Sequence, residues 1–189
     1  MITEFKIVEL TDTKFVHPLK IEYKQNGNQK FWEAVKSFDS VAILLYHKPK
    51  ESFLLVKQFR PPVYMHDRSH LNTFELCAGI LDKNASIEQI AKEEVEEECG
   101  FDVKLENIEK INSFYTNVGV SGAKQHLYYA QIDDSMKIGD GGGIHGEEIE
   151  LLYLPLNEAK EFIYDESKAK TPGLMFSFYW FFENGKDKE

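Results

Sequence analysis

Two glutamates in a Glu-rich stretch lie where a surface helix does not usually place charge. At about 100° per residue, Glu94 and Glu98 fall four residues apart in the same sector as Ile90 and Val95. This sector is the apolar stripe by which the helix would contact a core. A buried carboxylate is costly unless it is paired or bound to a cation, and no Lys or Arg shares this face. The spacing therefore predicts a site for a divalent cation, which prefers oxygen ligands. The alternative, which composition alone favours, is a solvated charged face.

The helix that carries these glutamates has recognisable ends. Ser86 followed by Gln89 is the pattern of a capping box, and Gly100 stands where a helix commonly stops. We therefore expect one helix over residues 86–99.

The same stretch resembles the signature of the Nudix hydrolases, in which glycines and glutamates recur at fixed spacing. The matching residues are Gly79, Glu94, Val95, Glu97, Glu98, Gly100 and Phe101. Two positions depart from the signature, because Ala85 stands in place of a glutamate and Glu93 in place of an arginine. In the family, these two residues support the loop and orient the helix carboxylates.

The resemblance implies Mg²⁺, or Mn²⁺, as the cofactor. It assigns the metal to the carbonyl of Ala78 and the carboxylates of Glu94 and Glu98. Glu97 would be a further ligand or a catalytic group beside the metal, and its alternative is a solvated helix residue. The histidines show no HxH or HExxH spacing, so a zinc site is not expected.

Three stretches outside the signature resemble the nucleoside diphosphate-sugar pyrophosphatase branch of the family: residues 31–33, 57–62 and 75–79. The resemblance assigns Arg60 to the substrate phosphates, Glu75 to a sugar or ribose, and Trp32 to stacking on the nucleobase. Each has an ordinary alternative. Arg60 would form a surface ion pair, Glu75 would face solvent from a strand, and Trp32 would belong to the core.

A glycine-rich segment at residues 133–146 precedes a further candidate. So many glycines resist a fixed shape, and we expect a mobile loop over a site. Glu147 follows it and resembles the base that orients or deprotonates the attacking water. Glu148 is the alternative base, and both could be a solvated loop end. His145 is a possible phosphate or water contact, although a lone loop histidine is usually incidental.

Hydrophobic patterns place these residues in an α/β fold with a mixed sheet and helices on two faces. The resemblance implies the Nudix α/β/α sandwich with a small N-terminal β element. Residues 61–71 are expected to form a loop. The expected helices, besides the Glu-rich one, cover residues 156–164 and 174–183. The expected strands cover residues 3–11, 18–24, 29–36, 40–47, 53–59, 74–77, 102–115, 125–132 and 148–154.

The N-terminal part is expected to form a unit of its own. Asn26-Gly27 between two strand-like runs is a strong hairpin signal. We predict a small β element at residues 1–38 and a main domain at residues 39–189. The element is too small to bury much surface alone, so it should pack on the main domain or on a second subunit. In related enzymes the partner subunit supplies it, so the resemblance implies a homodimer with exchanged N-terminal elements.

Composition limits the class of protein. The chain has 189 residues, 42% of them hydrophobic, and a net charge of −10. This predicts a packed domain and speaks against general binding to nucleic acid or anionic membranes. Cys77 and Cys99 show no metal-binding or disulfide pattern and are expected as buried free thiols. With no signal peptide and no long apolar run, a cytoplasmic protein is expected.

The leading functional hypothesis is Mg²⁺-dependent hydrolysis of UDP-sugars such as UDP-glucose, giving UMP and a sugar 1-phosphate. The alternative within enzymes is hydrolysis of ADP-ribose to AMP and ribose 5-phosphate. A third hypothesis, motivated by Ala85 and Glu93, is a nucleotide-binding module without turnover. The sequence does not decide among the substrates, because stacking on Trp32 tolerates any base.

Overall fold

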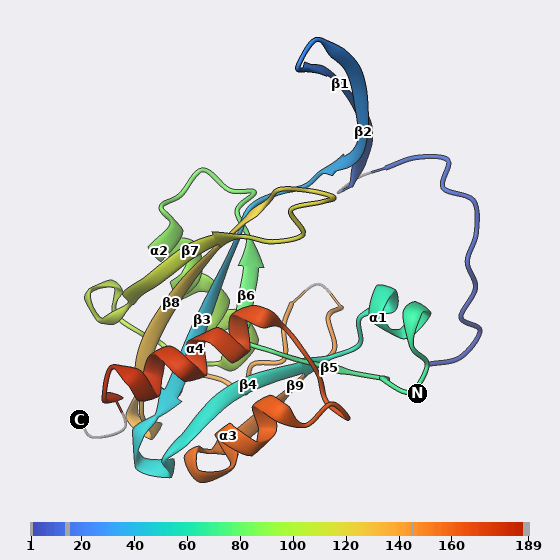
Figure 1. The fold of residues 1–189 in the computed structure, drawn as a ribbon. Helices are drawn as coiled ribbons and strands as arrows, with labels where there is room; N and C mark the ends of the chain where they lie inside the picture. Colours follow the sequence, from blue (N-terminus) through green and yellow to red (C-terminus); the bar gives the residue numbers. More distant parts are fainter. Residues whose placement is uncertain (1, 14–15, 145, 187–189) are drawn as a thin grey trace.

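The computed structural model describes residues 2–13, 16–144 and 146–186, and its main feature is one mixed sheet (Figure 1). The strands of this sheet are β3 (Ser40–His47), β4 (Ser52–Gln58), β5 (Thr73–Glu75), β6 (Cys77–Ile80), β7 (Glu109–Tyr115), β8 (Lys124–Ile132), β9 (Ile149–Pro155) and β10 (Ala169–Lys170). Their order is β10-β5-β4-β3-β8-β7, with β6 also on β3 and β9 also on β4. β3 runs parallel to β8 and β10 parallel to β5, while the other pairs are antiparallel.

The two central strands separate at one end. β3 and β4 pair only over residues 45–47 and 52–54. Beyond these residues, the start of β3 pairs with β6, and the end of β4 pairs with β5. Because β5 and β6 are separated only by Leu76, the chain crosses here from one branch of the sheet to the other. Residues at this open end can therefore face each other across the gap between the branches.

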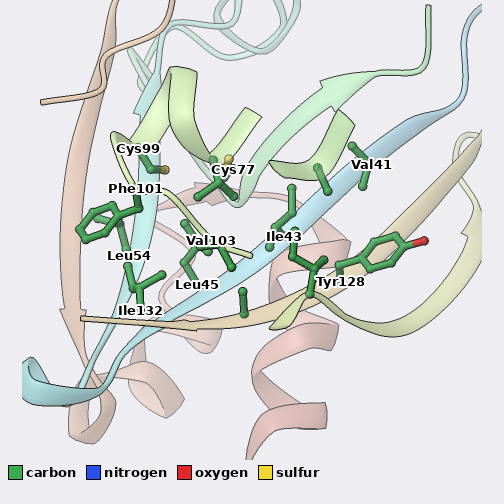
Figure 2. Packing of buried hydrophobic residues seen from close by; sticks show 14 of the residues in the cluster. Val41, Ile43, Leu45, Leu54, Cys77, Cys99, Phe101, Val103, Tyr128 and Ile132 are labelled. Atoms are coloured by element: carbon green, nitrogen blue, oxygen red, sulfur yellow. The ribbon is translucent and has the colours of Figure 1, made fainter. Parts of the chain in front are cut away.

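Helices cover both faces of the sheet. α2 (Ile87–Glu94) and the π-helical turn Val95–Cys99 lie on one face, while α3 (Leu156–Tyr164) and α4 (Pro172–Glu183) lie on the other (Figure 1). Alternate residues of β3 contact the two layers. Ile43 and Leu45 pack with the α2 side (Figure 2), and Leu44 packs with the α3 and α4 side. The expected α/β/α sandwich is confirmed.

The Glu-rich helix begins as expected but does not stay α-helical to its end. Ser86 Oγ accepts a hydrogen bond from the Gln89 N–H at 3.2 Å, and Gly100 adopts φ 74°. The side chain of Gln89 turns to Glu93 instead of completing the capping box. From Val95 onward the helix widens to a π turn, a feature often found at functional sites.

The N-terminal hairpin stands apart from the main sheet (Figure 1). β1 (His17–Gln25) and β2 (Asn28–Lys36) pair only with each other. Asn26 and Gly27 both have positive φ, as a two-residue hairpin turn of this hand requires. Among the residues that the structure describes, one backbone hydrogen bond, from the Val35 N–H to the Val120 carbonyl at 2.9 Å, joins the hairpin to the main domain. The predicted hairpin is thus confirmed.

Four sequence-based expectations about local structure were wrong. The expected strand 74–77 is interrupted at Leu76, between β5 and β6. The described residues 2–13 contain no strand. The segment is mostly exposed, and Phe5 contacts the main domain, with its ring edge-on to Tyr64 at 5.3 Å and under the guanidinium of Arg68. The expected loop 61–71 contains α1 (Pro61–His66), whose first residue is a proline in its preferred helical position. β7 starts at residue 109, after the 3₁₀ turn Leu105–Asn107, and the two-residue β10 was not expected.

Further 3₁₀ turns occur at Lys48–Lys50 and Asp134–Met136. No helix within the described ranges is long and apolar enough to cross a membrane.

Candidate functional site

A pocket of about 330 Å³ lies at the open end of the sheet, between the two branches. The ends of several strands, the Glu-rich helix and the residue that follows the glycine-rich segment all contribute to it. Its lining residues are Ser40, Gln58, Arg60, Glu75, Ala78, Gly79, Ile80, Glu94, Glu98, Gln125 and Glu147. Six residues that were singled out from the sequence thus meet in one pocket: Arg60, Glu75, Ala78, Glu94, Glu98 and Glu147. Trp32 and Glu97 do not line it.

Glu98 is a buried carboxylate in this pocket. It is 4% exposed, and its Oε2 accepts the Ala78 N–H at 2.9 Å. Burial raises the pKa of Glu98 to about 8, and the nearby charges of Glu94 and Glu147 act in the same direction. The environment therefore favours a proton or a cation on this group.

Glu94 lies directly against the backbone of β6 at Gly79, just before the loop at residues 81–86 (the motif loop) that leads into α2. A Cβ on Gly79 would stand 1.9 Å from Glu94 Oε1, so only glycine leaves room for this carboxylate. Burial, followed by the charge of Glu97, raises the pKa of Glu94 to about 7. The spacing in sequence between Gly79 and Glu94 thus reflects a direct contact.

The donors in this pocket fit a divalent cation. Glu94 and Glu98 present hard carboxylate oxygens whose pKa values are raised, and neither forms an ion pair with another described residue. A bound cation would replace the protons that these environments favour. Within the described part of the chain, no group of three or more His, Cys, Asp or Glu side chains is already arranged around a common metal position. The fit therefore rests on two carboxylates, together with the carbonyl that Ala78 can add.

Glu97 differs from its two neighbours. It is only partly buried and lies outside the pocket lining, although its charge reaches Glu94. Its backbone carbonyl accepts the Gly143 N–H at 3.2 Å. Its proposed role as a ligand or catalytic group remains a prediction.

The glycine-rich loop packs tightly on the end of the Glu-rich helix. The Gly142 N–H donates to the Glu98 carbonyl at 2.8 Å, so the loop caps carbonyls that a helix end leaves free. Gly141 has φ 66°, and a Cβ there would lie 2.3 Å from the same carbonyl. At residues 141–143 the glycines have a role that was not expected from the sequence, while the mobility expected for the segment stays a prediction. These glycines permit close backbone contact.

This loop places Glu147 in the pocket. The Glu147 carboxylate accepts the Ile144 N–H at 3.2 Å, and a Cβ on Gly143 would lie within 2.7 Å of it. Glu148 instead lines a different pocket with Lys57 and Phe59. The geometry thus separates the two candidate bases, while His145 lies outside the described residues.

Arg60 and Glu75 form a bidentate pair. The Arg60 Nε–H and an Nη–H donate to the two Glu75 carboxylate oxygens at 2.8 and 2.9 Å. The Thr73 hydroxyl donates to the same carboxylate. Glu75 is only 8% exposed, so the interpretation of a solvent-facing strand residue is wrong. The hydrogen-bonded pair with Glu75 is the main reason why the pKa of Arg60 is raised.

Trp32 lies on the hairpin and does not line the pocket of its own chain. It is 52% exposed, and its indole N–H donates to the Gly119 carbonyl at 2.8 Å. It is therefore not a core tryptophan.

Two features of the site were missed from the sequence. Thr73 lies two residues before Glu75 on the same face of a strand, a spacing that could have pointed to their contact. Lys83 in the motif loop forms an ion pair with Glu93 at 3.1 Å. This pair joins the loop to the helix at one of the two positions that depart from the signature, and the opposite charges ten residues apart were a visible signal.

Comparisons with known proteins agree with this geometry. The NUDIX domain family matches residues 36–172. The uridine diphosphate glucose pyrophosphatase NUDT14 of Bos taurus is 36% identical, covering 89% of this chain and 88% of its own length. Its counterpart in Mus musculus is 33% identical over the same shares. A GDP-mannose pyrophosphatase of Pectobacterium atrosepticum is 35% identical, covering 77% of this chain and 74% of its own. Because the family match spans most of the chain and includes the pocket, the chain belongs to the Nudix hydrolase family.

Proposed function

We propose that the protein hydrolyses the pyrophosphate bond of nucleoside diphosphate sugars, with UDP-sugars such as UDP-glucose as the preferred substrates. The observation that carries this proposal is the meeting of the buried carboxylate of Glu98, the partly buried carboxylate of Glu94, an arginine and a further glutamate in one pocket. The similarity to UDP-glucose pyrophosphatases supports the choice of substrate. The products would be UMP and glucose 1-phosphate.

The cation-binding part of the site is formed by Glu94 and Glu98, with the Ala78 carbonyl as a third donor and Glu97 as a further one. When bound there, Mg²⁺ (or Mn²⁺) would neutralise charge on the pyrophosphate and lower the pKa of the attacking water. Glu98 is oriented by the Ala78 N–H, and Glu94 by its contact with Gly79.

The remaining residues hold the substrate and move the proton. Arg60 donates N–H groups to the phosphate oxygens. Glu147 orients the attacking water and takes its proton as the new O–P bond forms. The bond between the same phosphorus and the bridging oxygen then breaks, and its electron pair stays on the leaving phosphate. Glu147 is favoured over Glu148 as the base because Glu147 lines this pocket and Glu148 lines another.

We further propose a homodimer in which the hairpin of one subunit reaches the pocket of the other. Two-stranded hairpins are marginally stable alone, and this one exposes large apolar side chains, including Phe31 at 63%. Within one chain, Trp32 does not reach the pocket. In the dimer, Trp32 of the partner subunit would stack on the nucleobase. We also propose a cytoplasmic location, which the two buried free thiols support.

The proposal is tested by incubating the purified protein with Mg²⁺ and UDP-glucose, ADP-ribose or GDP-mannose. Release of UMP from UDP-glucose at the highest kcat/KM is expected. Faster release of AMP from ADP-ribose would support the alternative substrate. Nucleotide binding without any release of monophosphate would show a binding module instead of an enzyme. Sedimentation of the same sample as a monomer would contradict the dimer.

A further inference from the structure

Arg60 is connected to the sheet through the side chain of Glu75, for which the only predicted role is a sugar contact. It follows β4 at the turn into α1, and its side chain is 45% exposed. An exposed arginine at a chain turn would normally sample many rotamers. Here, two of its N–H groups are held by both carboxylate oxygens of Glu75.

Glu75 is in turn held by its own strand. The Thr73 hydroxyl donates to Glu75 Oε1 and also lies 3.3 Å from the Gln58 carbonyl. Thr73 and Glu75 are two residues apart on β5, which is paired with β4 on one side and β10 on the other. A chain of contacts therefore runs from the sheet through Thr73 and Glu75 to Arg60.

The pairing leaves part of the guanidinium available. Of its five N–H groups, two are used by Glu75, and the other three have no hydrogen-bond partner in the described ranges. Arg60 lines the pocket that also contains Glu94, Glu98 and Glu147. Arg60 and Glu75 also line a neighbouring pocket of about 420 Å³ formed with α1 and β10. The pair thus belongs to the wall of both pockets.

We propose that Glu75 is a positioning residue for Arg60, and that Thr73 fixes Glu75. This inference rests on the proposed function and replaces the predicted contact between Glu75 and a sugar. With the guanidinium already held by a rigid strand, less of its freedom is lost when phosphate oxygens bind the three remaining N–H groups. Without Glu75, the anion would have to order Arg60 itself.

The experiment uses two ligands that differ in whether they contain a sugar. In Glu75→Gln, the KM for UDP-glucose and the Kd for inorganic pyrophosphate, both measured with Mg²⁺, should rise by a similar factor of about ten, with a smaller change in kcat. A direct sugar contact would raise the KM and leave pyrophosphate binding unchanged, which would overturn the proposal. Tighter pyrophosphate binding would also overturn it, since Glu75 would then compete with phosphate for Arg60.

Further variants separate positioning from general stability. Thr73→Val should weaken pyrophosphate binding by about threefold, while Thr73→Ser, which keeps the hydroxyl, should restore it. In an Arg60→Lys background, Glu75→Gln should have little further effect, because the bidentate partner is already lost. Additive effects of the two substitutions would contradict the chain of contacts.

The matched control is Glu150→Gln on β9. It removes the 2.8 Å ion pair between Glu150 and Lys57 of β4, and neither residue lines the catalytic pocket. It should leave pyrophosphate binding unchanged. If the wild-type protein binds pyrophosphate but hydrolyses no nucleotide sugar, the proposed function fails while the binding comparison still decides the role of Glu75. If the wild-type protein does not bind pyrophosphate, the role of Arg60 fails, and with it this inference.

Discussion

The two faces of the Glu-rich helix hold the same residue type in opposite environments. On the outer face, Glu93 pairs with Lys83, and Glu96 pairs with Lys92. On the inner face, Glu94 and Glu98 face the pocket and form no ion pair with a described residue. The outer glutamates are partly exposed, and pairs of this kind contribute at most about 1 kcal/mol.

The difference between the two faces shows for which glutamates the folded state disfavours the charged carboxylate. The pKa of Glu93 is lowered by Gln89 and Lys83, so its surroundings favour the charged form. The pKa values of Glu94 and Glu98 are raised, so the surroundings of these two residues disfavour the charged form. Groups with strongly perturbed pKa values in a pocket are candidates for function. Composition cannot separate these two classes of glutamate, but their positions around the helix can.

The largest expected effect comes from removing an inner carboxylate. Glu98→Gln keeps the shape of the side chain and removes the charge, so hydrolysis should fall by more than about 100-fold, since changes to groups that only orient metal ligands already cost 10–100-fold. Steady-state rates with UDP-glucose and Mg²⁺ measure this. The outer-face control, Glu96→Gln, should keep near-normal rates. Near-normal activity of Glu98→Gln would refute its role as a metal ligand.

A smaller but still large effect is expected from Gly79→Ala. The added Cβ would stand 1.9 Å from Glu94 Oε1, so the carboxylate must move. A displacement of about 1 Å in an active site can cost on the order of 100-fold in rate. Gly119→Ala is the matched control, since its Cβ would meet no atom within 4 Å. Equal activity of the two variants would show that the position of Glu94 is not critical.

The pH dependence of stability should also distinguish the two faces. The pKa of Glu98 is about 8 in the folded protein, above its ordinary value of 4.5, so the folded state binds this proton more tightly than the unfolded state. The stability from this proton is complete below pH 4.5 and is lost as the pH rises through about 8. Glu94, at about 7, acts in the same direction.

In thermal unfolding of the metal-free protein, Glu98→Gln should therefore raise the Tm at pH 8.5 by roughly 5 °C and change it little at pH 4.5. Adding Mg²⁺ at pH 8.5 should stabilise the wild-type protein, since the cation binds only the folded, deprotonated site. Glu96→Gln should not raise the Tm of the metal-free protein at pH 8.5 and should keep the stabilisation by Mg²⁺, because Glu94 and Glu98 are unchanged. If Glu98→Gln and the wild type had the same Tm at pH 8.5, the charged Glu98 carboxylate would not destabilise the folded protein.

Much of this contrast was predictable from the sequence, because it depends on local periodicity. The positions of Ile90 and Val95 define the buried side of the helix, and the helical repeat places Glu94 and Glu98 on that same side. The hairpin was predictable for a similar reason, since Asn26 and Gly27 supply the positive φ values that its turn requires.

The features that were not predictable depend on contacts between distant segments. The partner of Glu75 is decided by where β4 ends and where the chain turns into α1. The separation of β3 and β4 follows from which strands pair at each end, and no local pattern records that choice. Likewise, glycines that suggest flexibility in a sequence can serve close packing, as Gly141 does against the Glu98 carbonyl.

The smallest effects are expected on the outer face, at the ion pair that joins the motif loop to the helix. Lys83 and Glu93 are partly exposed, with side-chain exposures of 46% and 33%, so Glu93→Gln should lower the free energy of unfolding by no more than about 1 kcal/mol. Its effect on kcat/KM should stay within about threefold if the pair only tethers the loop, because the contact between Gly79 and Glu94 persists. Urea unfolding and steady-state rates at low and high salt measure both quantities, and high salt should reduce the difference between variant and wild type. A loss of activity comparable to that of Glu98→Gln would mean that the outer face also takes part in the chemistry, and the division between the two faces would fail.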